Sequence, residues 1–100
     1  MTGTAALKAS GEKLVRIRLS LEAGDVMNAE ISGDFFIHPE ESVSTLEDAL
    51  RGPLTGAGEL AERLRRAAES GGIELVGISV ESIARCALEA AASCTDRGNE

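Results

Sequence analysis

The strand-to-helix transition of this chain lies in residues 31–41, which read Ile-Ser-Gly-Asp-Phe-Phe-Ile-His-Pro-Glu-Glu. This stretch holds the only two aromatic residues, the only histidine and one of the two prolines. Apolar residues before it alternate with polar ones, as in half-buried strands, whereas those after it recur at helical spacing. The stretch therefore separates a β-rich first third of the chain from a helical remainder.

Three strands are expected on the N-terminal side. Period-2 alternation is clearest over residues 14–21, with a shorter strand over 5–9 and a third from 26 to about 37. Residues 1–4 are expected to fray. The strands predict an antiparallel meander with one polar face.

The two predicted loops, Ala9-Ser10-Gly11 and Glu22-Ala23-Gly24, fit three-residue hairpins that end in a left-handed glycine. An odd loop length keeps the odd-numbered residues of strands two and three on the core face. The resulting register has three cross-strand pairs: Leu19 with Met27, Ile17 with Ala29, and Arg16 with Glu30.

Three helices are expected after Pro39. The first contains Val43, Leu46 and Leu50 at helical spacing and ends before Gly52-Pro53. The second is centred on residues 60–68, and the third runs from 80 to about 92 after a short extended piece at 73–76. The predicted fold class is α+β, a three-stranded antiparallel meander followed by three helices packed on one face. We expect one domain over 1–100, with an ordered core of about 5–92 and a tail over 93–100.

Composition restricts the classes of function. A net charge of −7 argues against nucleic-acid binding, which needs a basic surface, and against binding an anionic membrane. No apolar run of about 18 residues could span a bilayer, and the N-terminus lacks a secretion signal pattern. A cytoplasmic location is therefore expected, and Cys86 and Cys94 are expected to be reduced.

A search for catalytic groups finds no constellation. The single histidine, His38, fits either a capping or exposed role or a functional contact. The two cysteines and His38 are too scattered for a metal site, and Gly56-Ala57-Gly58 is too short for a phosphate loop. We expect no activity from this chain alone and no cofactor bound to it.

The two phenylalanines are more informative. By strand parity, Phe35 joins Ile31 and Ile37 inside, while Phe36 lies on the other face. Two interpretations stay open: Phe36 docks on a partner, or a β-bulge at Gly33-Asp34 turns it inward. In the first, the hypothetical partner interface comprises Asp34, Phe36, His38, Arg16 and Arg18.

Several motifs together resemble a known family. They are Gly11-Glu12-Lys13-Leu14-Val15-Arg16-Ile17, the turn at Gly24, Ile31-Ser32-Gly33-Asp34-Phe35-Phe36 followed by Pro39-Glu40-Glu41, and Leu75-Val76-Gly77-Ile78 before a helix. In this the chain resembles the C-terminal accessory domain of lipoate–protein ligases over roughly residues 5–92.

The resemblance implies a role. In some archaea and bacteria this domain is a separate small subunit, paired with a large catalytic subunit that holds the lipoate and ATP sites. The pair makes lipoyl-AMP and transfers lipoate to a lysine of a carrier protein, either the glycine cleavage H protein or a 2-oxoacid dehydrogenase E2. The large subunit's glycine-rich Arg-Arg motif and catalytic lysine are absent here. The family fold is similar to that of iron–sulfur scaffold proteins.

That similarity leaves two alternative functions. An iron–sulfur scaffold or sulfur acceptor would need cysteines after a strand and at the following helix start, where this chain has Phe35, Phe36 and His38. The other alternative is an interaction module for an unrelated protein.

Overall fold

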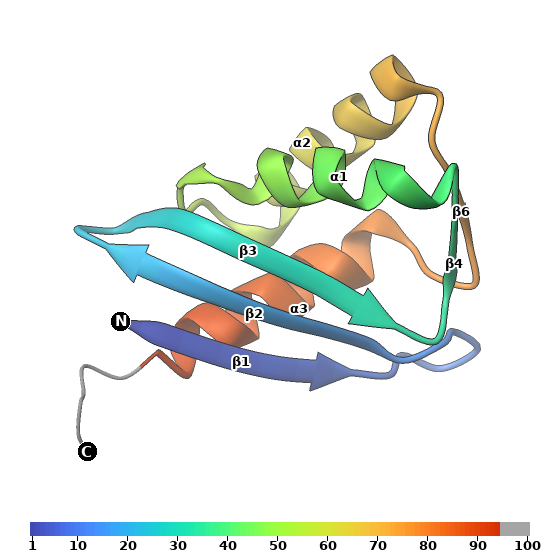
Figure 1. The fold of residues 1–100 in the computed structure, drawn as a ribbon. Coiled ribbons are helices and arrows are strands. Elements are labelled where there is room, and N and C mark those ends of the chain that lie inside the picture. Colours follow the sequence, from blue (N-terminus) through green and yellow to red (C-terminus); the bar gives the residue numbers. More distant parts are fainter. Residues whose placement is uncertain (95–100) are drawn as a thin grey trace.

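The computed structural model describes residues 1–94. Within that range the chain forms six strands, one 3-10 turn and three α-helices, arranged as shown in Figure 1. Their bounds are β1 (Thr2–Leu7), β2 (Val15–Glu22), β3 (Asp25–Gly33), β4 (Phe36–His38), η1 (Glu40–Ser42), α1 (Val43–Leu50), β5 (Gly52–Pro53), α2 (Ala57–Gly71), β6 (Glu74–Val76) and α3 (Val80–Ala92). The predicted α+β class and its three helices are confirmed. Of the predicted tail over 93–100, residues 95–100 lie outside the described residues.

The antiparallel meander extends further than predicted. Its strand order is β1-β2-β3-β5, with β5 pairing to β3 only at Asp25 and Val26. β1 begins at Thr2, whose Cα partner on β2 is Ser20. Residues 2–4 are therefore part of the sheet, and the expectation that they fray is wrong.

The predicted register between β2 and β3 is also wrong. Ile17 pairs with Ile31, and Arg18 rather than Arg16 lies opposite Glu30. The hairpin is a two-residue loop at Ala23 and Gly24, both with positive φ, which is the geometry of a type I′ turn.

A register shift between Ser20 and Leu21 compensates for the even loop. It leaves Met27 as the extra residue on β3 and turns Val26 into the core instead, so that Val26 is 3% exposed and Met27 48%. The bulge thus keeps the odd-numbered residues of both strands on the core face beyond it. The sequence had suggested that a three-residue loop would do this.

All three helices lie on one side of the sheet, as predicted (Figure 1). α3 packs on β1 and β2, α1 packs on β3, and α2 contacts the other two helices. The core between these layers is aliphatic; its largest fully buried side chains are Ile17, Leu19, Leu46, Leu50, Leu60, Leu64, Ile83, Val15 and Cys86. This arrangement leaves the other face of the sheet uncovered by the described helices.

The sequence had suggested a third strand that continues to about Ile37, but the strand ends earlier. β3 ends at Gly33, where φ is +155° and the amide of the next residue, Asp34, donates to the Leu14 carbonyl at 2.9 Å. A Cβ on Gly33 would lie 2.2 Å from that carbonyl oxygen, so only glycine fits. The chain then turns into β4, which pairs with β6 in a separate two-stranded ribbon at one end of the molecule (Figure 1).

Side chains form hydrogen bonds with backbone groups along β1, an edge strand of the sheet, and along the part of β3 that β5 does not pair. On β1, the Ser93 hydroxyl donates to the Thr4 carbonyl at 2.9 Å and accepts from the Thr4 amide at 3.0 Å. On β3, the Ile31 amide donates to a Glu47 carboxylate oxygen at 2.8 Å. Exposed strand edges are otherwise templates for pairing with other chains.

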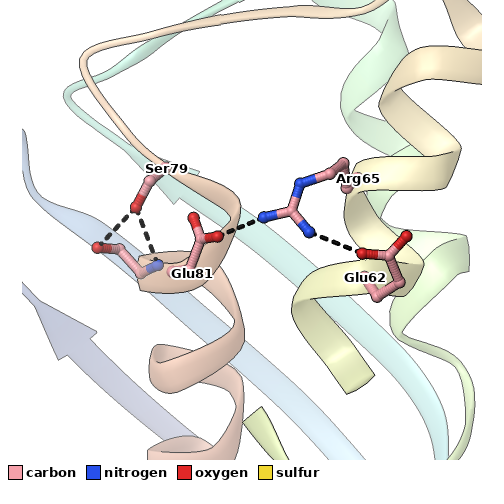
Figure 2. A network of polar contacts seen from close by, with 5 residues as sticks. Glu62, Arg65, Ser79 and Glu81 are labelled. Atoms are coloured by element: carbon pink, nitrogen blue, oxygen red, sulfur yellow. Dashed lines mark hydrogen bonds and ion pairs between the residues drawn. The ribbon is translucent and has the colours of Figure 1, made fainter. Parts of the chain in front are cut away.

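An ion-pair bridge joins α2 to α3 on the helical side. Arg65 donates to Glu62 at 2.8 Å and also pairs with Glu81 of α3, as Figure 2 shows. The hydrogen bond to Glu62, with Glu81 nearby, raises the pKa of Arg65 above its ordinary value. Glu62 also pairs with Arg66, four residues along α2, at 3.4 Å. Because these side chains are solvent-exposed, the ion pairs link the two helices but contribute little to the free energy of unfolding.

The start of α3 is fixed by hydrogen bonds to its first turn. Ser79 is the N-cap and accepts from the Ser82 amide at 3.1 Å (Figure 2). The Ser82 hydroxyl in turn donates to Glu12 of the β1–β2 loop at 2.6 Å. This hydrogen bond lowers the pKa of Glu12. The loop between the first two strands is thereby tied to the helix layer.

Both cysteines are free thiols, as predicted. Cys86 is 0% exposed, and burial together with the nearby Glu89 carboxylate raises its pKa to about 11. Burial also raises the pKa of the half-buried Cys94. Since the thiolate is the reactive form, both thiols are poor nucleophiles at neutral pH, and Cys86 is also inaccessible.

We therefore expect a thiol reagent at pH 8 to modify Cys94 slowly and to leave Cys86 unmodified in the folded chain. At three pH units below a pKa of about 11, roughly one Cys86 thiol in a thousand is ionised. Mass spectrometry of the labelled protein, before and after unfolding in denaturant, measures this directly. Equal labelling rates at Cys86 in folded and unfolded protein would contradict its burial.

Candidate partner-binding surface

The first candidate region is the uncovered face of the sheet. β2 places Arg16 and Arg18 there, both exposed, because alternate residues of a strand point to opposite faces. Their neighbours on β1 and β3 are mostly small, so the two long side chains stand beside a hollow of about 540 Å³. We call this hollow the sheet trough; its lining includes Thr4, Ala6, Arg16, Arg18, Glu30 and Ser32.

The second region is the ribbon of β4 and β6. Phe36 pairs across it with Val76, and the two side chains are 71% and 49% exposed. His38 pairs with Glu74 at the next position on the same face. Phe36 also borders a smaller hollow of about 270 Å³, together with Phe35, Ile37 and Val43.

The structure decides between the two interpretations of Phe36. Its ring is exposed, and the chain breaks after Gly33 instead of bulging, so Phe36 does not enter the core. Phe35 and Ile37 are partly buried and pack against the core, as parity predicted. Asp34 and His38 are exposed, as expected for the polar side of this segment.

The predicted interface is divided between the two regions. Arg16 and Arg18 lie on β2 in the sheet trough, whereas Asp34, Phe36 and His38 lie on or beside the ribbon, outside that sheet. The prediction that the arginines lie across one sheet from Phe36 is therefore wrong, because β4 pairs with β6 and not with β3. The two regions nevertheless adjoin, since Ser32 lines both hollows.

Sequence reasoning did not find Val76 or Ser32. The alternation in residues 73–76 contained a usable signal, because it places Ile73 and Leu75 inward and leaves Glu74 and Val76 on the outer face. What the sequence did not reveal is that this piece pairs with residues 36–38. That pairing brings two exposed apolar side chains together from positions 40 residues apart, 36 and 76.

Among residues 1–94, no cluster of three or more His, Cys, Asp or Glu side chains is placed to hold a metal ion. In the same part of the chain, no helix is long and apolar enough to cross a membrane.

Comparisons with known proteins point to one family. A scan against models of protein families found no match. Lipoate-protein ligase A subunit 2 from Thermoplasma acidophilum is 49% identical over 39 residues, which are 39% of this chain and 42% of that protein. The matched stretch therefore covers less than half of the relative's length.

A solved structure extends the similarity over most of the chain. It comes from a structural analysis of an archaeal lipoylation system, a bi-partite lipoate protein ligase and its E2 lipoyl domain from Thermoplasma acidophilum. The TM-score is 0.70 at 30% identity, over 86% of this chain and 93% of the other. The fold thus defines a small α+β protein with one helix-covered and one open sheet face. The chain belongs to the small-subunit family of bipartite lipoate–protein ligases.

Proposed function

We propose that this chain is a non-catalytic, cytoplasmic accessory subunit that acts with a large catalytic subunit in ATP-dependent lipoate adenylation. The complex would form lipoyl-AMP and then transfer the lipoyl group to a lysine of a carrier protein. The observation that supports this most is the shared fold at 30% identity over 93% of a chain from an archaeal lipoylation system.

The proposal assigns different roles to the two subunits. The large subunit would supply the ATP and lipoate sites, and this chain would bind neither. The carriers would be the E2 lipoyl domain, as in the archaeal system, or the glycine cleavage H protein. The two thiols of this chain are poorly suited to carry an acyl group, because burial raises the pKa of both.

An accessory subunit can promote adenylation in two physical ways. It can bind one conformation of the catalytic subunit more tightly than another and so shift the population toward the active form. It can also cover the active site and exclude water from the reactive acyl-adenylate. Either mechanism requires a broad docking surface and no catalytic side chain from this chain.

Two alternatives rest on weaker grounds. The likeness of this fold to iron–sulfur scaffold proteins stays a prediction, and such a role would need accessible thiolates, whereas Cys86 is fully buried. An interaction module for an unrelated protein would use the same open surfaces. Absorbance after reconstitution with iron and sulfide tests the first alternative, and identification of co-purifying proteins tests the second.

The decisive experiment is lipoate-dependent exchange of pyrophosphate into ATP, measured with the cognate catalytic subunit, with this chain, and with both. We expect no exchange from this chain alone and a strong increase when it is added to the catalytic subunit. Transfer of lipoate to an E2 lipoyl domain should show the same dependence. Full exchange by the catalytic subunit alone would overturn the proposed function.

A further inference from the structure

The first observation concerns exposed apolar side chains. In the described part of the chain, the large hydrophobic residues that remain exposed are Met1, Met27, Phe36 and Val76. Only Phe36 and Val76 among them are cross-strand partners, and together they form a continuous apolar spot on the ribbon. Exposed aromatic side chains with apolar neighbours are typical of the central contacts in protein interfaces.

The second observation concerns charge. Arg51, Arg65 and Arg66 each form an ion pair with a carboxylate, but Arg16 and Arg18 form none with the residues that the structure describes. Glu30 is the single acidic side chain that lines the sheet trough, so the trough has a local excess of positive charge in a chain of net charge −7. A partner surface that carries carboxylates would be complementary to it.

The third observation concerns size. A stable interface buries about 800 Å² on each partner, far more than two side chains supply. The apolar spot therefore needs a neighbouring surface, and Ser32 joins it to the sheet trough. The opposite face of the sheet is covered by α1 and α3, which leaves the trough as the broad surface that adjoins Phe36.

We propose that the catalytic subunit docks across the ribbon and the sheet trough together. Phe36 and Val76 enter an apolar pocket of that subunit, and Arg16 and Arg18 face its carboxylates. This inference rests on the proposed function, and it adds which surface binds and the chemistry that the partner must present.

The test measures the dissociation constant of the complex by titration calorimetry, with pyrophosphate exchange as a second readout. Phe36→Ala should raise Kd about 30-fold, as expected for a central aromatic contact. The double variant Arg16→Glu, Arg18→Glu should raise it at least about tenfold. Wild-type affinity should fall with added salt, and this dependence should weaken in the double variant.

Matched controls change the same chemistry elsewhere. Met27→Ala truncates another exposed large hydrophobic side chain, 48% exposed and at the other end of β3, and Arg85→Glu reverses an exposed charge on α3. Both should bind within about twofold of wild type. Thermal unfolding of each variant checks its fold, and Val76→Ser is a second test of the apolar spot.

The outcomes separate the two proposals. If the wild-type chain binds and activates the catalytic subunit, but the Phe36 and arginine variants do so equally well, the docking surface is wrong and the proposed function stands. Weakening by Arg85→Glu alone would place the interface on the helices and overturn the docking surface. If the wild-type chain neither binds nor activates that subunit, both proposals fail.

Discussion

Gly33→Ala should destabilise the fold by about 3 kcal/mol or more. The added Cβ would lie 2.2 Å from the Leu14 carbonyl oxygen and 2.9 Å from the Phe35 ring, and φ at this position is +155°. Backbone in this region costs a residue with a side chain about 1–3 kcal/mol, and the clash must be relieved by moving the Leu14 backbone, just before β2, or the Phe35 ring. For a chain of this size, the melting temperature should fall by roughly 10 °C or more.

Gly58→Ala is the matched control for this substitution. Gly58 lies in the first turn of α2, and a Cβ there would meet no atom within 4 Å apart from its chain neighbours and the backbone of its own helix. Because alanine favours helix over glycine by up to about 1 kcal/mol, this variant should be slightly more stable than wild type. Thermal and urea unfolding of both variants measure the two effects. A Gly33→Ala variant as stable as wild type would show that the end of β3 is far less constrained than described.

Leu64→Ala should cost about 3–5 kcal/mol in the free energy of unfolding. Leu64 is fully buried on α2, the helix that packs against both α1 and α3, so its loss leaves a cavity in the middle of the helix layer. Leu88→Ala makes the same chemical change on a partly buried residue of α3. It should cost about 1 kcal/mol, since less apolar area returns to water.

Urea unfolding of the two leucine variants, with the slope m held common, gives the difference in stability. A 100-residue domain is stable by only about 5–15 kcal/mol, so Leu64→Ala is expected to bring the chain close to unfolding at 37 °C. Equal costs for Leu64 and Leu88 would be inconsistent with the packing of α2 between its neighbours.

The helices could be predicted from sequence because their signals are local. The third helix was expected to begin at residue 80, where α3 begins, and Val43, Leu46 and Leu50 indicated the inward face of α1. The period-2 pattern likewise placed β2 to within one residue. In each of these elements, the spacing of the apolar residues and the residues at its ends indicate the same structure, so only one assignment fits the sequence.

The parts that could not be predicted depend on pairing between distant residues. Two loop solutions satisfy the same parity at Ala23-Gly24, and only the structure distinguishes the two-residue turn with a bulge from a three-residue loop. Val76, a part of the candidate site, was missed for the same reason. Exposure of Phe36 followed from parity, but its neighbour Val76 follows from the pairing of β4 with β6, which no local pattern specifies.

The side-chain hydrogen bonds at the edges of β1 and β3 have a consequence for copies of this chain that have no partner. A subunit synthesised in excess of its partner must survive alone, with its open sheet exposed to identical copies. Ser93 forms hydrogen bonds with the backbone of Thr4, and Glu47 accepts one from the Ile31 amide. If these backbone groups were free, they could pair with a strand of another copy. We therefore expect unassembled copies to have fewer free backbone groups for edge-to-edge pairing, while the broad face that we assign to the partner stays accessible.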